Sequence, residues 1–97
     1  MRATVLTHAA RDDLNAIWGY WADLNLDAAD RIRDEIIAGV RRIAEMPTIG
    51  HRHREIREPS LLVWRVRNYL IAYQPAGDPI PIVRIIDGRR DLATILR

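Results

Sequence analysis

Apolar residues recur with a helical period in two segments of the N-terminal half of the chain. In the first, from His8 to about Leu24, apolar residues lie three, four, seven and ten positions after Leu14. This spacing places them on one stripe of a helix. These positions are Leu14, Ile17, Trp18, Trp21 and Leu24. The second segment, from about Ala28 to Met46, carries the stripe Ala29, Ile32, Ile36, Val40, Ile43 and Met46. The pattern predicts a hairpin of two amphipathic helices joined by a short connection.

Residues at the ends of these segments indicate where the helices start and stop. A short strand is expected over residues 2–7, and Thr7 is suited to cap the first helix. Asp27 is the expected cap of the second helix, and Pro47 should end it. Gly39 costs about 1 kcal/mol against alanine inside a helix. Its expected role is to let the first helix approach closely.

The C-terminal half changes to a strand-like pattern after a polar loop at residues 51–60. Three apolar, β-branched runs follow, at residues 61–66, 69–75 and 80–87. Arg67-Asn68 fits a two-residue hairpin loop in which asparagine takes the positive φ. Residues 91–97 should form a short helix. We therefore expect one α+β domain over residues 1–97, ordered β-α-α-β-β-β plus a C-terminal helix, with an antiparallel sheet covered on one face by the helical hairpin.

The hairpin turn fixes which side chains share a face of the sheet, since paired residues point the same way. The helix-facing set is Leu62, Trp64, Val66, Tyr69, Ile71 and Tyr73, and the opposite set is Val63, Arg65, Leu70 and Ala72. If Val83 and Ile85 face the helices, Arg84 joins Arg65 on the opposite face. That face would then expose both guanidinium groups and apolar surface, which suits a partly anionic, partly apolar partner. The alternative is that these arginines pair with Asp87, Glu55 or Glu58 and have no further role.

Composition narrows the class of protein. Hydrophobic residues make up 48% and charged residues 29% of the 97 residues, which is typical of a globular chain. Cysteine is absent, which excludes a disulfide scaffold and a thiolate nucleophile. The N-terminus is too polar for a signal peptide, and no apolar run approaches the roughly 20 residues of a membrane span. We expect a cytoplasmic protein that does not associate with membranes. All fifteen positive residues are arginines, but a net charge of +2 is too small for a general nucleic-acid coat.

No catalytic or metal site can be assigned from residue spacing. His51 and His53 form an H-x-H pair in the loop, but two ligands without a third are a weak metal signal. Phosphate-binding glycine loops and Ser-His-Asp sets are missing from the sequence. Tyr69, Tyr73 and the three tryptophans are expected to be packing residues, and Asp87 is expected to pair with Arg89 or Arg90. We therefore expect no metal and no cofactor.

Five segments in order resemble the ParE branch of the RelE/ParE superfamily, the toxins of type II toxin–antitoxin modules. They are "LTHAARDDLNAIWGYW" (6–21), "AADRIRDEI" (28–36), "EMPTIGHRHRE" (45–55), "RNYLIAYQP" (67–75) and "VRIIDGRRDL" (83–92). The resemblance covers nearly the whole chain and implies a helical hairpin on a curved antiparallel sheet. It also implies a cognate, ParD-like antitoxin as partner in a hetero-oligomer. ParE-like members inhibit DNA gyrase and serve plasmid stabilisation, whereas RelE-like members cut messenger RNA on the ribosome.

The residues favour the first of these two activities. A ribonuclease needs a general base and a general acid, and the segment after Arg84 contains no His, Tyr or Lys. Many ParE relatives have histidine before the glycine where this chain has Asp87, so the family pattern is broken there. We predict a non-enzymatic gyrase inhibitor without sequence-specific DNA binding of its own. Its target- or antitoxin-binding residues are expected to be Arg65, Arg84, Arg89 and Arg90. The alternatives are a RelE-like endoribonuclease and an inactive toxin retained as an antitoxin-binding protein.

Overall fold

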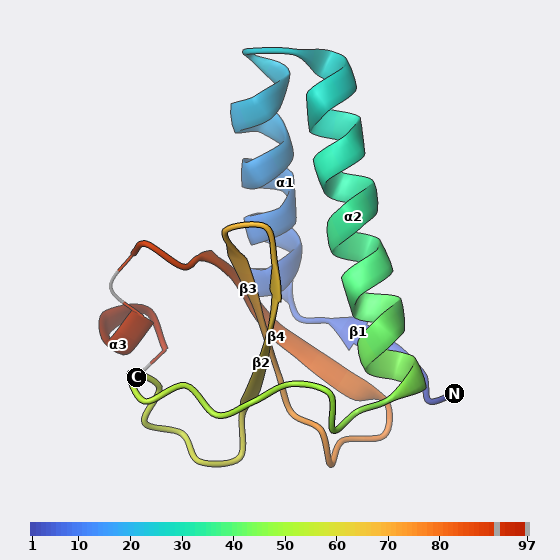
Figure 1. The fold of residues 1–97 in the computed structure, drawn as a ribbon, viewed down its shortest axis with the longest axis vertical. Helices are drawn as coiled ribbons and strands as arrows, with labels where there is room; N and C mark the ends of the chain where they lie inside the picture. Colours follow the sequence, from blue (N-terminus) through green and yellow to red (C-terminus); the bar gives the residue numbers. More distant parts are fainter. Residues whose placement is uncertain (91, 97) are drawn as a thin grey trace.

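The computed structural model describes residues 1–90 and 92–96, and Figure 1 shows its ribbon. The elements in chain order are β1 (Thr4–Leu6), α1 (His8–Ala22), α2 (Leu26–Glu45), β2 (Leu62–Val66), β3 (Tyr69–Tyr73), β4 (Ile80–Asp87) and α3 (Leu92–Ile95). The predicted α+β class and element order are confirmed. α3 falls within the predicted helix at 91–97, whose first and last residues lie outside the described part of the chain.

The helical hairpin begins and ends at side chains that satisfy free backbone groups. Thr7 caps α1 as predicted, with its Oγ1 accepting the Ala10 N–H at 3.1 Å. The predicted cap of α2 at Asp27 is wrong, because α2 starts two residues earlier. Asn25 is the cap and accepts the Ala28 N–H at 2.9 Å, while Asp27 lies in the first turn, where a negative charge suits the helix dipole. In the described part of the chain, no helix combines the length and the apolar character needed to cross a bilayer.

The sheet is mixed, with strand order β1-β4-β3-β2. The antiparallel pairing of β2, β3 and β4 is confirmed, and β1 adds to β4 in parallel. The hairpin register is also the predicted one, with Val66 opposite Tyr69. The positive φ of 54°, however, belongs to Arg67 and not to Asn68. The Arg67 guanidinium donates two 2.8 Å hydrogen bonds to the Glu35 carboxylate on α2, which ties the turn to the helix.

The main core lies between the helical hairpin and one face of the sheet. It contains the predicted α2 stripe and the helix-facing strand residues, with Tyr73 fully buried. Leu24 and Met46 are the exceptions among the predicted core positions, since their exposed fractions are 66% and 56%. Leu24 follows α1 at the end of the hairpin that projects beyond the sheet in Figure 1. The three tryptophans are only half-buried, and the Trp18 indole N–H donates to Asp30 at 2.9 Å.

A second apolar cluster covers the opposite face of the sheet. Val63, Leu70, Ala72 and Ile86 point to this face and are at most 3% exposed. The side chains that cover them come from the 51–61 loop and from the C-terminal segment; they are Ile56, Leu61, Leu92 and Leu96. The expectation of an open, partly apolar outer face is therefore wrong. Burial of apolar surface is favourable, so the chain covers this face with its own tail.

A β-bulge in β4 breaks the strict alternation on which the predicted position of Arg84 depended. Tyr73 pairs with Ile82, and Ala72 pairs with Arg84, so Val83 is an extra residue. Ile82 and Ile85 consequently both face the helices, while Val83 packs against the second cluster. The assumption that Val83 faces the helices together with Ile85 is therefore wrong for Val83. Arg84 shares the register of Ala72, as expected for the outer face.

Gly39 lies where α2 crosses the sheet and not where it meets α1, which corrects the predicted neighbour. A Cβ added there would lie 2.6 Å from Val66 Cγ2 and 3.0 Å from Ile71 Cδ1. Both atoms belong to the hairpin of β2 and β3. The close contact therefore sets the distance between α2 and the sheet.

We predict that Gly39→Ala destabilises the fold by about 1–3 kcal/mol, because overpacking outweighs the better helix propensity of alanine. Gly19→Ala is the matched control: it lies within α1, and an added Cβ would meet nothing within 4 Å. The control should stabilise the fold by about 0.5–1 kcal/mol. Urea unfolding measures both changes, and equal effects of the two substitutions would contradict the assigned role of Gly39.

Candidate functional site

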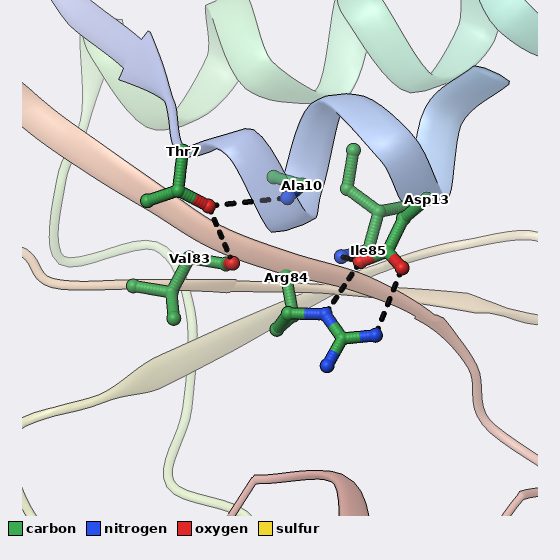
Figure 2. A network of polar contacts seen from close by, with 6 residues as sticks. All are labelled: Thr7, Ala10, Asp13, Val83, Arg84 and Ile85. Carbon is green, nitrogen blue, oxygen red and sulfur yellow. Dashed lines mark hydrogen bonds and ion pairs between the residues drawn. The ribbon is translucent and has the colours of Figure 1, made fainter.

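The start of α1 is attached to the edge of β4 by polar side chains (Figure 2). β1 ends at Leu6 and pairs only with the first part of β4, so the rest of that edge lacks a strand. Thr7 continues the pairing with its N–H to Ile82 O at 3.1 Å and its hydroxyl to Val83 O at 2.8 Å. Asp13, further along α1, accepts the Ile85 N–H at 2.9 Å. Side chains of α1 thus replace the missing strand.

Asp13 also binds the guanidinium of Arg84. Arg84 Nε lies 2.7 Å from Asp13 Oδ2, and Arg84 Nη2 lies 2.9 Å from Oδ1, a two-point ion pair. The Arg84 and Asp13 side chains are 28% and 16% exposed, so the pair is partly desolvated. These hydrogen bonds raise the pKa of Arg84 above its ordinary value. The third nitrogen, Nη1, has no partner among the described residues and is available to a ligand (Figure 2).

An open pocket of about 500 Å³ lies beside this ion pair. α1, the turn between β2 and β3, the end of β4 and the C-terminal segment supply its walls. The lining residues are Asp13, Ala16, Ile17, Tyr20, Trp21, Asn68, Tyr69, Arg84, Ile85, Ile86, Asp87, Arg89, Arg90 and Ile95. Three of the four arginines predicted from the sequence, Arg84, Arg89 and Arg90, are therefore close to one another at one site.

Asp87 and Arg89 form a second two-point ion pair at the rim of the pocket. Arg89 Nη2 lies 2.7 Å from Asp87 Oδ2, and Arg89 Nε lies 3.0 Å from Oδ1. The hydrogen bonds from Arg89 lower the pKa of Asp87 to about 2. The expected pairing of Asp87 is thus confirmed. Arg90 is exposed and has no ion pair with any described residue, and its positive charge contributes to the lowered pKa of Asp87. It adds a third guanidinium group to the pocket.

Arg65 does not line this pocket, unlike the other three predicted residues. It lies on β2, and its Nη1 makes only a long contact of 3.4 Å to the carbonyl oxygen of Arg67. A second open cavity of about 420 Å³ also includes Arg84 in its lining. Its lining residues are Arg57, Glu58, Leu61, Val83, Arg84, Ile95 and Leu96. Arg84 and Ile95 are shared by the two cavities, so Arg84 is the central cation of this region.

Four important pocket residues were not assigned to the site from the sequence: Asp13, Tyr20, Trp21 and Tyr69. Trp21 and Tyr69 pack against the main core, as expected, but both are only half-buried and also line the pocket. The Trp21 indole N–H donates to the Tyr69 hydroxyl at 2.9 Å. The sequence of α1 contains a pattern that could have identified some of these pocket residues. Asp13, Ala16, Ile17 and Tyr20 recur at helical spacing and form a stripe that borders the core stripe and shares Ile17 with it. The stripe combines the acidic Asp13 and the aromatic Tyr20 with two apolar residues, which distinguishes it from a helix face that is only polar and solvated.

The pocket offers cations, an aromatic wall and apolar surface. Three guanidinium groups are suited to carboxylates or phosphates. Tyr20, Trp21 and Tyr69 supply flat apolar area of the kind that anchors protein partners. Among the described residues, no group of three or more His, Cys, Asp or Glu side chains could hold a metal ion, and His51 instead pairs through its backbone with Val63. The arrangement is chemically suited to an anionic, partly apolar ligand.

We predict that Asp13→Asn lowers the free energy of unfolding by about 1–3 kcal/mol, because Arg84 loses its charged partner in a partly desolvated site. Asp12→Asn is the matched control, since Asp12 is exposed on the same helix and has no ion pair among the described residues. Its effect should stay within about 0.5 kcal/mol. Chemical unfolding distinguishes the two, and equal losses would show that the Asp13 contacts do not stabilise the fold.

We also predict that the Asp87–Arg89 pair contributes to the acid sensitivity of the fold. The pKa of Asp87 in the folded chain, about 2, lies below its ordinary value of 3.8, so folding favours the ionised form. This stabilisation is complete above about pH 4 and is lost as the pH falls toward about 2. Asp87→Asn and Arg89→Ala should each flatten the dependence of the urea midpoint on pH in this range. Unchanged pH profiles in both variants would contradict the prediction.

Comparison with known proteins agrees with this description. The model of the family described as the ParE toxin of the type II toxin–antitoxin system parDE matches residues 4–92. No curated protein matches the chain. A solved structure titled "Chromosomal ParDE TA system from P. aeruginosa" superposes with a TM-score of 0.75 at 21% identity, covering 90% of this chain and 96% of that one. It therefore shares the fold. Since the family model spans most of the sequence, this chain belongs to the ParE toxin family of type II toxin–antitoxin systems, within the RelE/ParE superfamily.

Proposed function

We propose that this ParE-family toxin acts in the cytoplasm by binding DNA gyrase, without catalysis, and that a ParD-like antitoxin neutralises it. The observation that carries the proposal is the pocket in which Arg84, Arg89 and Arg90 lie beside an aromatic wall. Guanidinium groups next to aromatic side chains are typical of the centres of protein–protein interfaces. The site therefore fits a macromolecular protein ligand better than a small substrate.

The ionisation of the pocket supports binding over catalysis. Cleavage of RNA needs a base that accepts a proton near neutral pH and an acid that returns one. Asp87, whose pKa is about 2, is too weak a base, and Asp13 is occupied by Arg84 and by the Ile85 N–H. The described lining residues include neither His nor Lys. Of the two tyrosines in the pocket, Tyr69 accepts the Trp21 indole N–H, whereas the Tyr20 hydroxyl has no hydrogen bond with a described residue. A RelE-like ribonuclease therefore stays the second candidate.

An antitoxin partner is supported by the chemistry of the same region. The superposed structure is titled as a chromosomal ParDE TA system. Carboxylates of an acidic antitoxin segment would bind Arg90 and the free nitrogen of Arg84, while apolar side chains would contact Trp21 and Ile95. A segment that folds on binding can follow both cavities, which meet at Arg84. Antitoxin and gyrase would then compete for one surface.

Arg89 and Arg90 permit a test that leaves the structural ion pair of Arg84 intact. We predict that Arg89→Ala combined with Arg90→Ala lowers the inhibition of gyrase supercoiling at least about tenfold, as expected for the loss of two charged contacts. Arg31→Ala combined with Arg41→Ala is the control. It removes the same charge from the exposed face of α2, away from the pocket, and should retain full inhibition.

The assay includes wild-type toxin, both double variants and toxin premixed with its antitoxin, with messenger RNA integrity followed in a parallel translation reaction. Inhibited supercoiling with intact message supports the proposal, and antitoxin should restore supercoiling. Message cleavage with normal supercoiling would establish the ribonuclease alternative. A toxin that binds antitoxin but affects neither reaction would be an inactive family member.

A further inference from the structure

The loop from His51 to Arg57 carries a basic surface that the pocket does not include. Within seven residues it has three arginines, two histidines and one glutamate, so its arginine–glutamate balance of +2 equals the net charge of all 97 residues. The formal charges of the remaining residues therefore sum to zero, and residues 84–90 at the pocket are a second segment with a balance of +2. Arg52, Arg54 and Arg57 are exposed and form no ion pair with any described residue.

The loop is held in place at several points, although its charged side chains are free. His51 pairs with Val63 of β2 through backbone hydrogen bonds of 3.0 and 2.9 Å. Ile56 is 5% exposed and anchors the loop in the second apolar cluster. The Ile56 N–H donates to the His53 carbonyl at 2.9 Å and closes a turn between the arginines. Such anchoring lowers the entropy lost when the arginines contact a ligand.

The acidic side chains adjacent in sequence, Glu55 and Glu58, form no ion pair with these cations. Glu58 accepts hydrogen bonds from the Ser60 N–H at 3.0 Å and the Ser60 hydroxyl at 2.7 Å, and these contacts lower the pKa of Glu58. Its carboxylate therefore closes its own turn and does not bind an arginine. Glu55 forms no ion pair with a described residue. Both carboxylates leave the three guanidinium groups available to an external anion.

The kind of anion follows from what the loop lacks. Apart from Ile56, which points inward, residues 51–57 are all polar or charged. Protein interfaces depend on apolar and aromatic anchors, which the pocket has and this loop does not. Contacts to a phosphodiester backbone need only cationic and polar groups. We propose that the loop at residues 51–57 is a non-sequence-specific binding surface for the phosphate backbone of duplex DNA.

This surface is continuous with the proposed protein-binding region. Arg57 lines the second cavity together with Arg84, which also lines the main pocket. A target that presents protein beside duplex DNA would contact the pocket and the loop at once. The biological role of DNA binding rests on the proposed gyrase target, whereas DNA binding itself is measured with the toxin alone. Failure of one proposal is therefore distinguishable from failure of the other.

The test measures fluorescence anisotropy of a short labelled DNA duplex of random sequence with purified toxin at increasing salt. Three phosphate contacts give a slope of about −2.7 in log affinity against log salt, or a loss of roughly 40-fold between about 50 and about 200 mM. Replacing Arg52, Arg54 and Arg57 with alanine should weaken binding at least about tenfold and remove most of this slope. Since all three are exposed, the unfolding midpoint should stay unchanged.

The matched control replaces Arg31, Arg41 and Arg42 on α2 with alanine, the same charge change at exposed positions. Full DNA binding by this control together with loss in the loop variant supports the proposal. Equal losses in both variants would show a non-local charge effect and overturn it. Displacement of the duplex by poly-glutamate as readily as by unlabelled DNA would assign the loop to an acidic protein instead. Tighter binding of RNA than of duplex DNA would likewise reject the assignment.

Discussion

The carboxylate of Asp13 is the contact on which the functional region depends. It accepts the Ile85 N–H at the open edge of β4 and binds two nitrogens of Arg84. One side chain on α1 thus substitutes for a missing strand and fixes the direction of the central guanidinium. Without it, the Ile85 N–H at the edge of β4 would lack a hydrogen-bond acceptor in a partly buried position. The Arg84 side chain could then adopt several rotamers. The pocket wall formed by α1 is held against β4 by the same contact.

Both faces of the sheet are apolar, and this explains where the site is located. The helical hairpin covers one face, and the 51–61 loop with the C-terminal segment covers the other. Most of the apolar surface of both faces is therefore covered within the chain. The guanidinium groups of the pocket, those of Arg84, Arg89 and Arg90, lie at the rim where α1, the β2–β3 turn and the chain after β4 meet. Binding at such a rim needs no unfolding of the sheet, and it uses side chains that the ion pairs of Asp13 and Asp87 already orient.

Two chemically different cationic surfaces meet at Arg84. The pocket combines arginine with tyrosine and tryptophan, whereas the loop at residues 51–57 combines arginine with histidine and no exposed apolar side chain. The first composition is suited to protein and the second to phosphate. A toxin that binds DNA gyrase on DNA could use the pocket for the protein and the loop for the DNA at the same time. Arginine in place of lysine at every cationic position adds planar, two-point contacts to either kind of ligand.

The sequence by itself determined the elements of the fold, the hairpin register and the family. Helical and strand periods are local properties, so the α2 stripe and the pairing of Val66 with Tyr69 could be predicted from spacing alone. The resemblance to ParE toxins identified the family, and the arginines singled out near the C-terminus include three that line the pocket. Tertiary structure alone decided the partner of Arg84, the covering of the outer face and the parallel position of β1. Each joins residues far apart in the chain, as Asp13 and Arg84 do, and the bulge at Val83 leaves no sign in the alternation of residues. Local patterns fix which face a side chain occupies within its own element, but only packing fixes what lies opposite it.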